Sequence, residues 1–103
     1  MASMLAKTKT GIGYKGTTIQ EHSDWFRVTL YNTDVYTETE SKVFLDNGRW
    51  NTPTTAQRIN SALVHRGFQP GISRVGGVMS YRGQPFINGK LELNKSEMRR
   101  LDR

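Results

Sequence analysis

Basic and aromatic side chains recur through the second half of the sequence at a spacing that suits an anionic partner. One guanidinium or ammonium group follows another every eight or nine positions, and an indole stands beside the first of them: Arg49, Trp50, Arg58, Arg66, Arg74, Arg82 and Lys90. Guanidinium groups bind phosphate through paired hydrogen bonds, and exposed aromatic rings stack on nucleobases. These side chains are therefore candidate contacts for nucleic acid or for an acidic protein surface.

The charge pattern supports the same interpretation. No Asp or Glu lies within residues 47–91, whereas the whole chain has 15 Lys and Arg against nine Asp and Glu, a formal net charge of +6. A basic half without carboxylates of its own presents positive potential to phosphate or to acidic protein. The sequence leaves two arrangements open: the basic groups converge on one face, or they are scattered and solvated.

Residues that commonly carry catalysis or bind metals are sparse in this chain. There is no cysteine, which excludes disulfides and thiolate metal sites, and the two histidines are His22 and His65. Hydrolytic and metal sites need several convergent ligands, or a nucleophile beside a base. Glu38 and Glu40 are expected at a hairpin tip, where solvation explains them. We predict a protein that is not an enzyme and that has no cofactor, no bound metal and no small-molecule substrate.

A glycine-rich segment near the start, GIGYKG at residues 11–16, matches the pattern G-x-G-x-x-G. In a dinucleotide site this pattern turns the chain from a strand into a helix. Here no strand is expected before it, and the residues after it favour an extended chain. We interpret residues 1–16 as a flexible basic arm, residues 17–93 as a single domain and residues 94–103 as a charged tail.

The elements that must position the candidate residues begin with strands. Residues 25–31 alternate apolar and polar, with Phe26, Val28 and Leu30 on one face. A turn at residues 32–34 leads to two further strands at 35–37 and 42–45, joined by the polar residues 38–41. Shorter strands are expected at 72–75 and 78–81, followed by a hairpin of 86–87 and 90–91 turned by Asn88 and Gly89.

One helix is predicted over residues 54–66. Thr54 and Gln57 fit a capping box, and Ala56, Ile59, Ala62 and Leu63 form an apolar stripe at helical spacing. Arg58, Ser61 and His65 are expected on the other faces. Gly67 suits the left-handed position after the helix, with Phe68 folding back on Leu63. The fold class is α+β: an antiparallel sheet of about five or six strands packed on one helix.

Two stretches, residues 30–35 and 43–60, resemble small proteins of tailed bacteriophages and prophages. The shared features are a strand containing Thr33-Asp34-Val35, a G-x-W turn at residues 48–50, and the helix start T-x-T-T-x-x-R-x-N at residues 52–60. The resemblance implies a phage origin and expression in the cytoplasm of a bacterial host. It carries over no catalytic residue.

These observations together predict a function by binding. We expect a small phage accessory protein whose basic half binds nucleic acid or a host nucleoprotein complex, with inhibition of host defence, including an anti-CRISPR role, among the possible outcomes. The alternative is a protein-interaction or morphogenesis component with an acidic protein partner. No membrane association is expected, because no apolar run approaches the roughly 20 residues that a spanning helix needs.

Overall fold

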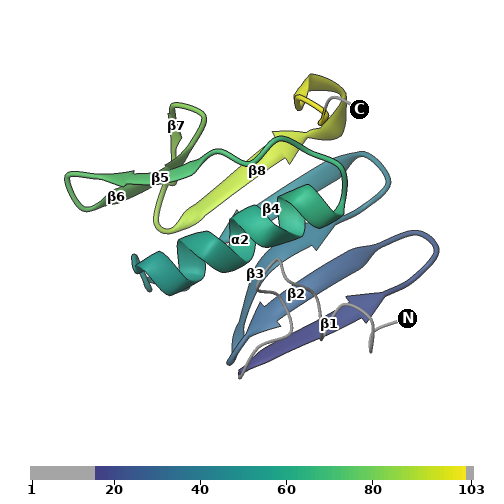
Figure 1. Cartoon of the computed structure of the whole chain (residues 1–103), viewed down its shortest axis with the longest axis horizontal. Helices are drawn as coiled ribbons and strands as arrows, with labels where there is room; N and C mark the ends of the chain where they lie inside the picture. Colours follow the sequence, from purple (N-terminus) through teal and green to yellow (C-terminus); the bar gives the residue numbers. More distant parts are fainter. Residues whose placement is uncertain (1–15, 102–103) are drawn as a thin grey trace.

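Five antiparallel strands form the main sheet, and one helix lies across one of its faces (Figure 1). The computed structural model describes residues 16–101, so most of the arm predicted at residues 1–16 lies outside the described residues. The strand order is β1-β2-β3-β4-β8. Their bounds are β1 Thr17–Glu21, β2 Phe26–Leu30, β3 Thr33–Glu38, β4 Lys42–Asp46 and β8 Lys90–Asn94.

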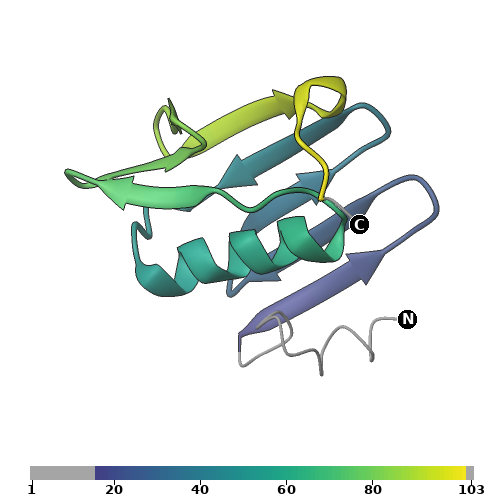
Figure 2. The same cartoon turned by 45° about the horizontal axis from the view of Figure 1, so that its top comes forward.

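A second, smaller sheet lies beside the helix. It consists of β5 (Ile72–Val75), β6 (Val78–Tyr81) and β7 (Gln84–Pro85), in that order. In Figures 1 and 2 the turn between β5 and β6 extends past the start of the helix, at the end of the molecule where β8 begins. A short 3-10 helix, η1 (Lys95–Glu97), follows β8.

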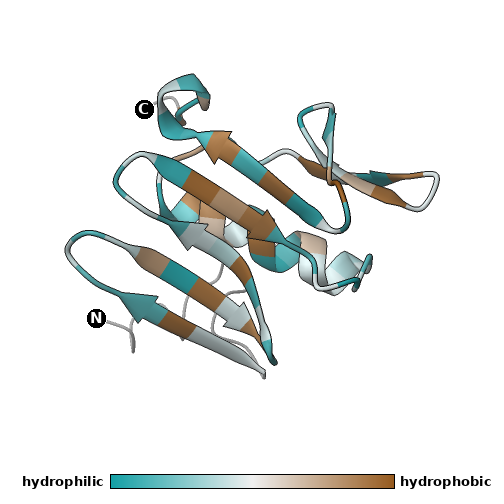
Figure 3. Ribbon diagram, turned by 180° about the vertical axis from the view of Figure 1, so that it is seen from behind, coloured by the Kyte–Doolittle hydropathy of each residue, from teal (hydrophilic) through white to brown (hydrophobic). Residues whose placement is uncertain are grey.

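Alternating side chains divide the main sheet into an apolar and a polar face. Phe26, Val28 and Leu30 of β2 are buried, whereas Arg27 and Thr29 between them are half-buried on the opposite face. The register carries this alternation across the sheet, and Figure 3 shows it as bands of opposite hydropathy on each strand. The apolar face therefore packs against the helix, and the other face remains polar.

The helix α2 spans Pro53–His65, and its N-cap lies two residues before the expected one. Thr52 is the N-cap, and its hydroxyl oxygen accepts a hydrogen bond from the Thr55 backbone N–H at 3.3 Å. The prediction of Thr54 as the cap was wrong. Pro53 occupies the first turn because its missing N–H would have no intrahelical partner there, and its fixed φ already suits a helix.

The C-terminal end of α2 follows the prediction. Gly67 has φ +88°, and the Phe68 backbone N–H donates to the Leu63 carbonyl at 2.8 Å, which returns the fully buried Phe68 ring to the core. The α+β class, with an antiparallel sheet packed on one helix, is confirmed. In the described part of the chain no helix is long and apolar enough to cross a membrane.

Two residues expected on the outer faces of α2 are buried. Arg58 and Ser61 are each 7% exposed to solvent, because the helix is covered both by the main sheet and by β5. The Arg58 Nε donates to the Thr17 hydroxyl of β1 at 3.2 Å, and its Nη1 donates to the Gln57 side chain at 3.1 Å. Arg58 therefore ties the helix to the edge strand, which corrects its expected exposure.

Candidate nucleic-acid interface

Four of the sequence-predicted site residues lie at one end of the molecule. This end, here called the loop end, consists of the β2–β3 turn at 31–32, the loop 47–52, the end of β5 with the β5–β6 turn at 74–78, and the turn at 87–90; it carries Arg49, Trp50, Arg74 and Lys90. The Asn47 backbone N–H donates to the Gly89 carbonyl at 2.8 Å, and the Arg74 Nη1 donates to the Asn51 carbonyl at 3.2 Å. These bonds join three segments that are far apart in the sequence.

Asn47 holds the loop end together from inside. It is 6% exposed, its Oδ1 accepts the Arg49 backbone N–H at 2.8 Å, and its Nδ2 lies 4.0 Å from the Met79 sulfur. A Cβ on Gly89 would lie 2.6 Å from the same Oδ1, so only glycine permits this approach. Arg49 is therefore displayed from a loop that is fixed to both β6 and the Gly89 turn.

Three exposed non-glycine residues of the loop end have a backbone conformation that glycine favours, and one of them, Asn88 (φ +53°), is an asparagine, which adopts it more readily. Arg49 has φ +69° and Tyr31, in the turn between β2 and β3, has φ +56°. The left-handed region costs a non-glycine residue roughly 1–2 kcal/mol relative to the usual helical region. Local geometry thus does not explain an arginine and a tyrosine here, and such outliers often accompany a binding role. The turn itself was expected at residues 32–34; it lies one residue earlier, and Thr33 already belongs to β3.

Aromatic and apolar groups are also exposed at the loop end. Trp50 is 63% exposed and Tyr31 is 67% exposed, and both line one hollow of about 210 Å³ together with Leu30 and Thr52. On the other side of the loop, Val75, Val78 and Ile87 are exposed as well. Large apolar groups gathered at one end of a small domain are typical of an interaction surface.

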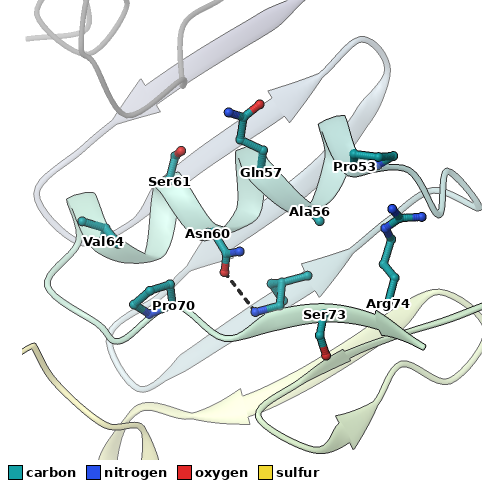
Figure 4. Close-up of a pocket in the computed structure, with 10 residues that line it drawn as sticks. Pro53, Ala56, Gln57, Asn60, Ser61, Val64, Pro70, Ser73 and Arg74 are labelled. Carbon is teal, nitrogen blue, oxygen red and sulfur yellow. Dashed lines mark hydrogen bonds between the residues drawn. The ribbon is translucent and has the colours of Figure 1, made fainter.

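Two hollows flank the loop 47–52, and a third lies between α2 and β5. Besides the one under Trp50, a hollow of about 470 Å³ lies between the loop, β6 and the Gly89 turn. The third, of about 720 Å³, is an open groove between α2 and β5 (Figure 4), with Arg74 near Pro53. In this groove the Asn60 Oδ1 accepts the backbone N–H groups of Gly71 and Ile72, both at 3.0 Å, which fixes β5 beside the helix.

Carboxylates near the loop end are engaged in local bonds. The Asp46 Oδ1 accepts the Gly48 backbone N–H at 2.8 Å. Asp34, beside the Tyr31 turn, accepts the Thr29 hydroxyl at 2.7 Å and lies 3.7 Å from the Arg27 Nε. These carboxylates organise the turns, while Arg49, Arg74 and Lys90 are exposed and set the positive character of this end.

Arg66 lies at the other end of α2 and belongs to a buried ionic network. Its Nε donates to Glu38 Oε1 at 2.9 Å, and its guanidinium lies 4.7 Å from the centre of the Phe26 ring. Glu38, 4% exposed, also accepts bonds from the Tyr36 hydroxyl at 2.9 Å and from the Lys95 ammonium at 2.7 Å. The expected solvated hairpin tip at Glu38 was therefore wrong: β3 continues through this residue and turns it inward.

The network sets the ionisation of its members. Burial alone raises the pKa of Glu38, but hydrogen bonds from Arg66, Lys95 and Tyr36 outweigh it and hold the pKa below the ordinary 4.5. Burial and the neighbouring Glu38 raise the pKa of the Tyr36 hydroxyl, which stays protonated and donates. Burial lowers the pKa of His65, the last residue of α2.

These shifts predict that the domain loses stability in acid. Because the pKa of Glu38 is lower in the folded state, its contribution is complete above the unfolded value of 4.5 and is lost as the pH falls through the folded pKa. His65, whose pKa is also lowered, adds a loss that begins as the pH falls below the unfolded value of 6.5. Urea unfolding between pH 7 and pH 3 should show a falling free energy of unfolding, and a flat profile would contradict the network.

Arg82 does not join the loop end. It is exposed in the turn between β6 and β7 with φ +49°, and its backbone N–H donates to the Gly71 carbonyl at 3.0 Å. The structure thus brings together Arg49, Trp50, Arg74 and Lys90 and separates them from Arg58, Arg66 and Arg82. Sequence reasoning missed the uncharged members Asn47, Asn51 and Asn88 and their hollow; the only local signals were the two Asn-Gly turns.

Within residues 16–101 no group of three or more His, Cys, Asp or Glu residues suits a metal ion.

Comparison with known proteins identifies the family. No curated protein and no solved structure matches the chain. The profile of the family described as Kyanoviridae Gp96 protein matches residues 2–100, which is nearly the whole sequence. The chain belongs to the Kyanoviridae Gp96 family of phage proteins.

Proposed function

We propose that the protein is a small, non-enzymatic phage accessory protein that acts in the cytoplasm of the bacterial host by binding nucleic acid, or a host complex that contains nucleic acid, through the loop end. The observation that carries the proposal is the meeting of Arg49, Arg74 and Lys90 with the exposed rings of Trp50 and Tyr31. Surfaces that bind single-stranded nucleic acid commonly combine cations along the phosphate backbone with aromatic rings that stack on the bases.

The open face of the main sheet is a poorer candidate. Phe44, 37% exposed on this face, lies opposite Glu92 in the register of β4 and β8, and the half-buried Trp25 ring is covered by the Arg27 guanidinium at 4.7 Å. Glu92 forms an ion pair with Lys42. A face that alternates charges of both signs attracts phosphate less than the loop end does.

Binding at the loop end suits a protein that acts by occupying a surface. A compact domain that covers part of a nucleoprotein complex inhibits it without chemistry of its own. Inhibition of a host defence system, of the anti-CRISPR type, is the outcome we propose for a phage protein with this surface.

A second candidate function rests on the exposed aliphatic groups. The side chains of Val75, Val78 and Ile87 are 74%, 47% and 68% exposed. Aliphatic side chains neither pair with phosphates nor stack on bases as aromatic rings do, so nucleic-acid binding does not explain their exposure. Trp, Tyr and Arg are also the residues that dominate protein–protein hot spots. The alternative is therefore a protein-interaction or morphogenesis component with an acidic protein partner.

The salt dependence of binding tests the first proposal. The affinity for a generic oligonucleotide should fall log-linearly with salt, with a slope of about −0.7 to −0.9 per phosphate contact. Arg49→Gly removes one phosphate contact, so the salt slope should become shallower by the amount expected for one contact. Glycine suits the positive φ at this position, so the melting temperature should be unchanged or higher. Fluorescence anisotropy across a salt series measures this slope.

The matched control is Arg82→Gly, which removes the same charge at another exposed, positive-φ position outside the loop end. Its slope should equal that of the unchanged protein. Equal flattening by both variants would show diffuse attraction without a defined surface. Absence of binding to any DNA or RNA at low salt would remove the nucleic-acid proposal and leave the acidic protein partner.

A further inference from the structure

The groove between α2 and β5 is bounded on one side by the open edge of a β-strand (Figure 4). β5 is the first strand of the small sheet, so β6 pairs with it on one side only. Its other side faces α2, because the Ile72 backbone N–H reaches the Asn60 side chain of the helix at 3.0 Å. An open strand edge presents backbone donors and acceptors that pair with another extended chain.

The register shows which backbone groups of β5 point into the groove. The two residues that flank the two-residue turn between β5 and β6 form a hydrogen-bonded pair, and bonded and non-bonded pairs alternate along the hairpin from there. Arg74 and Met79 are therefore a non-bonded pair, and the Met79 carbonyl instead accepts the Phe86 N–H beside β7 at 2.8 Å. The N–H and C=O of Arg74 and the C=O of Ile72 point away from β6, toward the helix.

These backbone groups indicate the class of ligand. Two of the three are carbonyl acceptors, and within residues 16–101 no strand lies on that side of β5 to supply donors. A phosphate backbone offers acceptors only, whereas an extended peptide offers N–H and C=O groups in alternation and adds to a sheet edge as a further strand. Going beyond the function proposed above, we infer that the groove between α2 and β5 binds an extended, acidic segment of a partner protein as an additional strand beside β5.

The helix forms a wall that accommodates the side chains of an added strand. It presents one stripe to the groove, made of residues three or four positions apart: Pro53, Ala56, Gln57, Asn60, Ser61 and Val64. At 1.5 Å per residue the stripe is roughly 16 Å long, which is the length of about five extended residues. The groove has a volume of about 720 Å³ and contains short side chains such as Ala56 at its centre, so a segment of about five residues fits it.

The groove is fixed before a ligand binds. The Asn60 Oδ1 accepts the backbone N–H groups of Gly71 and Ile72, and the Tyr81 hydroxyl donates to the Gln69 carbonyl at 2.9 Å. These bonds hold the chain that leads into β5 against the helix on one side and against β6 on the other. A pre-shaped groove loses little entropy on binding.

The charge of the groove indicates which peptide it favours. Among the ten residues that line it, Arg74 carries the only charge. Its guanidinium lies near Pro53 at the start of α2 (Figure 4), and it uses one of its five N–H donors on the Asn51 carbonyl. The first turn of α2 contains no acidic residue, so the partial positive charge of the helix start adds to that of Arg74. A carboxylate of the bound segment is therefore favoured at this end of the groove.

The test uses pentapeptides with blocked ends, in which valine alternates with glutamate or with lysine. Titration of the glutamate peptide into isotope-labelled protein should shift the NMR amide signals of β5 and of the helix stripe. It should bind about tenfold more tightly than the lysine peptide, which corresponds to one charge-assisted hydrogen bond. Equal binding of the lysine peptide would overturn the acidic preference.

A fully N-methylated glutamate peptide is the matched control, because it keeps the charge and has no backbone donors. It should not shift the signals of β5. Binding equal to that of the unmethylated peptide would overturn strand addition. Shifts centred on Arg49 and Trp50 would show attraction by charge at the loop end and would overturn the groove site.

Two variants at one position separate the charge from the backbone. Arg74→Ala removes the guanidinium and keeps the N–H, so it should abolish the preference for glutamate over lysine and retain part of the binding. Arg74→Pro also removes the N–H and should weaken binding about tenfold further, again the effect of one hydrogen bond. Proline is tolerated there because this N–H points away from β6, and unchanged β6 amide signals would verify the hairpin. Equal affinities of the two variants would overturn pairing along β5; the N-methylated peptide carries this test on the unchanged protein if Arg74→Pro disrupts the hairpin.

The outcomes are distinguishable from those of the oligonucleotide test. Peptide binding in the groove without binding of any DNA or RNA would support this inference and remove the proposed nucleic-acid function. Normal oligonucleotide binding, with no peptide-induced shift in β5 or α2, would overturn the groove site and retain the proposed function.

Discussion

Replacement of Glu38 by alanine is expected to lower the free energy of unfolding by about 3–5 kcal/mol, because it removes a buried carboxylate that two partly exposed cations and one buried hydroxyl share. Glu38 is 4% exposed and accepts bonds from Arg66, Lys95 and Tyr36. Without the carboxylate, the buried Tyr36 hydroxyl loses the acceptor of its hydrogen bond. Urea or thermal unfolding measures the loss.

Two comparisons make this result specific. Glu40→Ala removes the same charge two residues away at an exposed position, and it should change stability by less than about 0.5 kcal/mol. Glu38→Gln keeps the shape and loses the charge, so it should be milder than Glu38→Ala and should flatten the acid side of the pH profile. Similar losses for the Glu38 and Glu40 alanine variants would show that the network does not stabilise the fold.

The network also shows where reasoning from the sequence stops. Residues 38–41 are polar and lie between two apolar strands, a pattern typical of a solvated turn. What makes Glu38 a core residue is Arg66, 28 positions further on, together with Lys95 after the last strand. No local pattern contains that pairing, since it depends on the end of α2 meeting the end of β3.

Elements with local signals were predicted well. The alternation in β2 and the Gly67-Phe68 ending of α2 depend on neighbouring residues, and both are present in the structure. The helix start was displaced because Thr52 and Thr54 both suit a cap, and the choice between them rests on Pro53 at the first helical position. Arg58 is buried because strands distant in sequence cover α2, and its bond to Thr17, 41 positions away, has no local signal.

The candidate site follows the same division. Arg49 and Trp50 stand out in the sequence by type, but their meeting with Arg74, Lys90 and Tyr31 results from pairing between distant strands. Asn51 carries no charge and no motif, and Asn88 stands out only as part of an Asn-Gly turn, so composition does not mark either as a site residue. Their significance comes from the shared hollow, which only the folded chain forms.

The second large effect concerns the contact between helix and sheet. Leu63→Ala should lower the free energy of unfolding by about 2–5 kcal/mol, because the site is fully buried and the cavity left behind would collapse only in part. Leu63 belongs to one core cluster with Phe26, Val28 and Phe68, and these large side chains are fixed in place by β2 and by the helix end. They have little freedom to move into the space.

Val64→Ala is the matched control for Leu63→Ala, since it shortens the next side chain of the same helix at a position that is 37% exposed. It should cost much less, because solvent already covers part of that side chain and alanine favours a helix. The Leu63 carbonyl accepts the Phe68 N–H in both variants, so the helix ending is retained and the difference reports on packing alone. An unchanged melting temperature for Leu63→Ala would contradict the packing of α2 on the main sheet. A loss equal to that of Val64→Ala would place the stabilising contact elsewhere, on the β5 side of the helix.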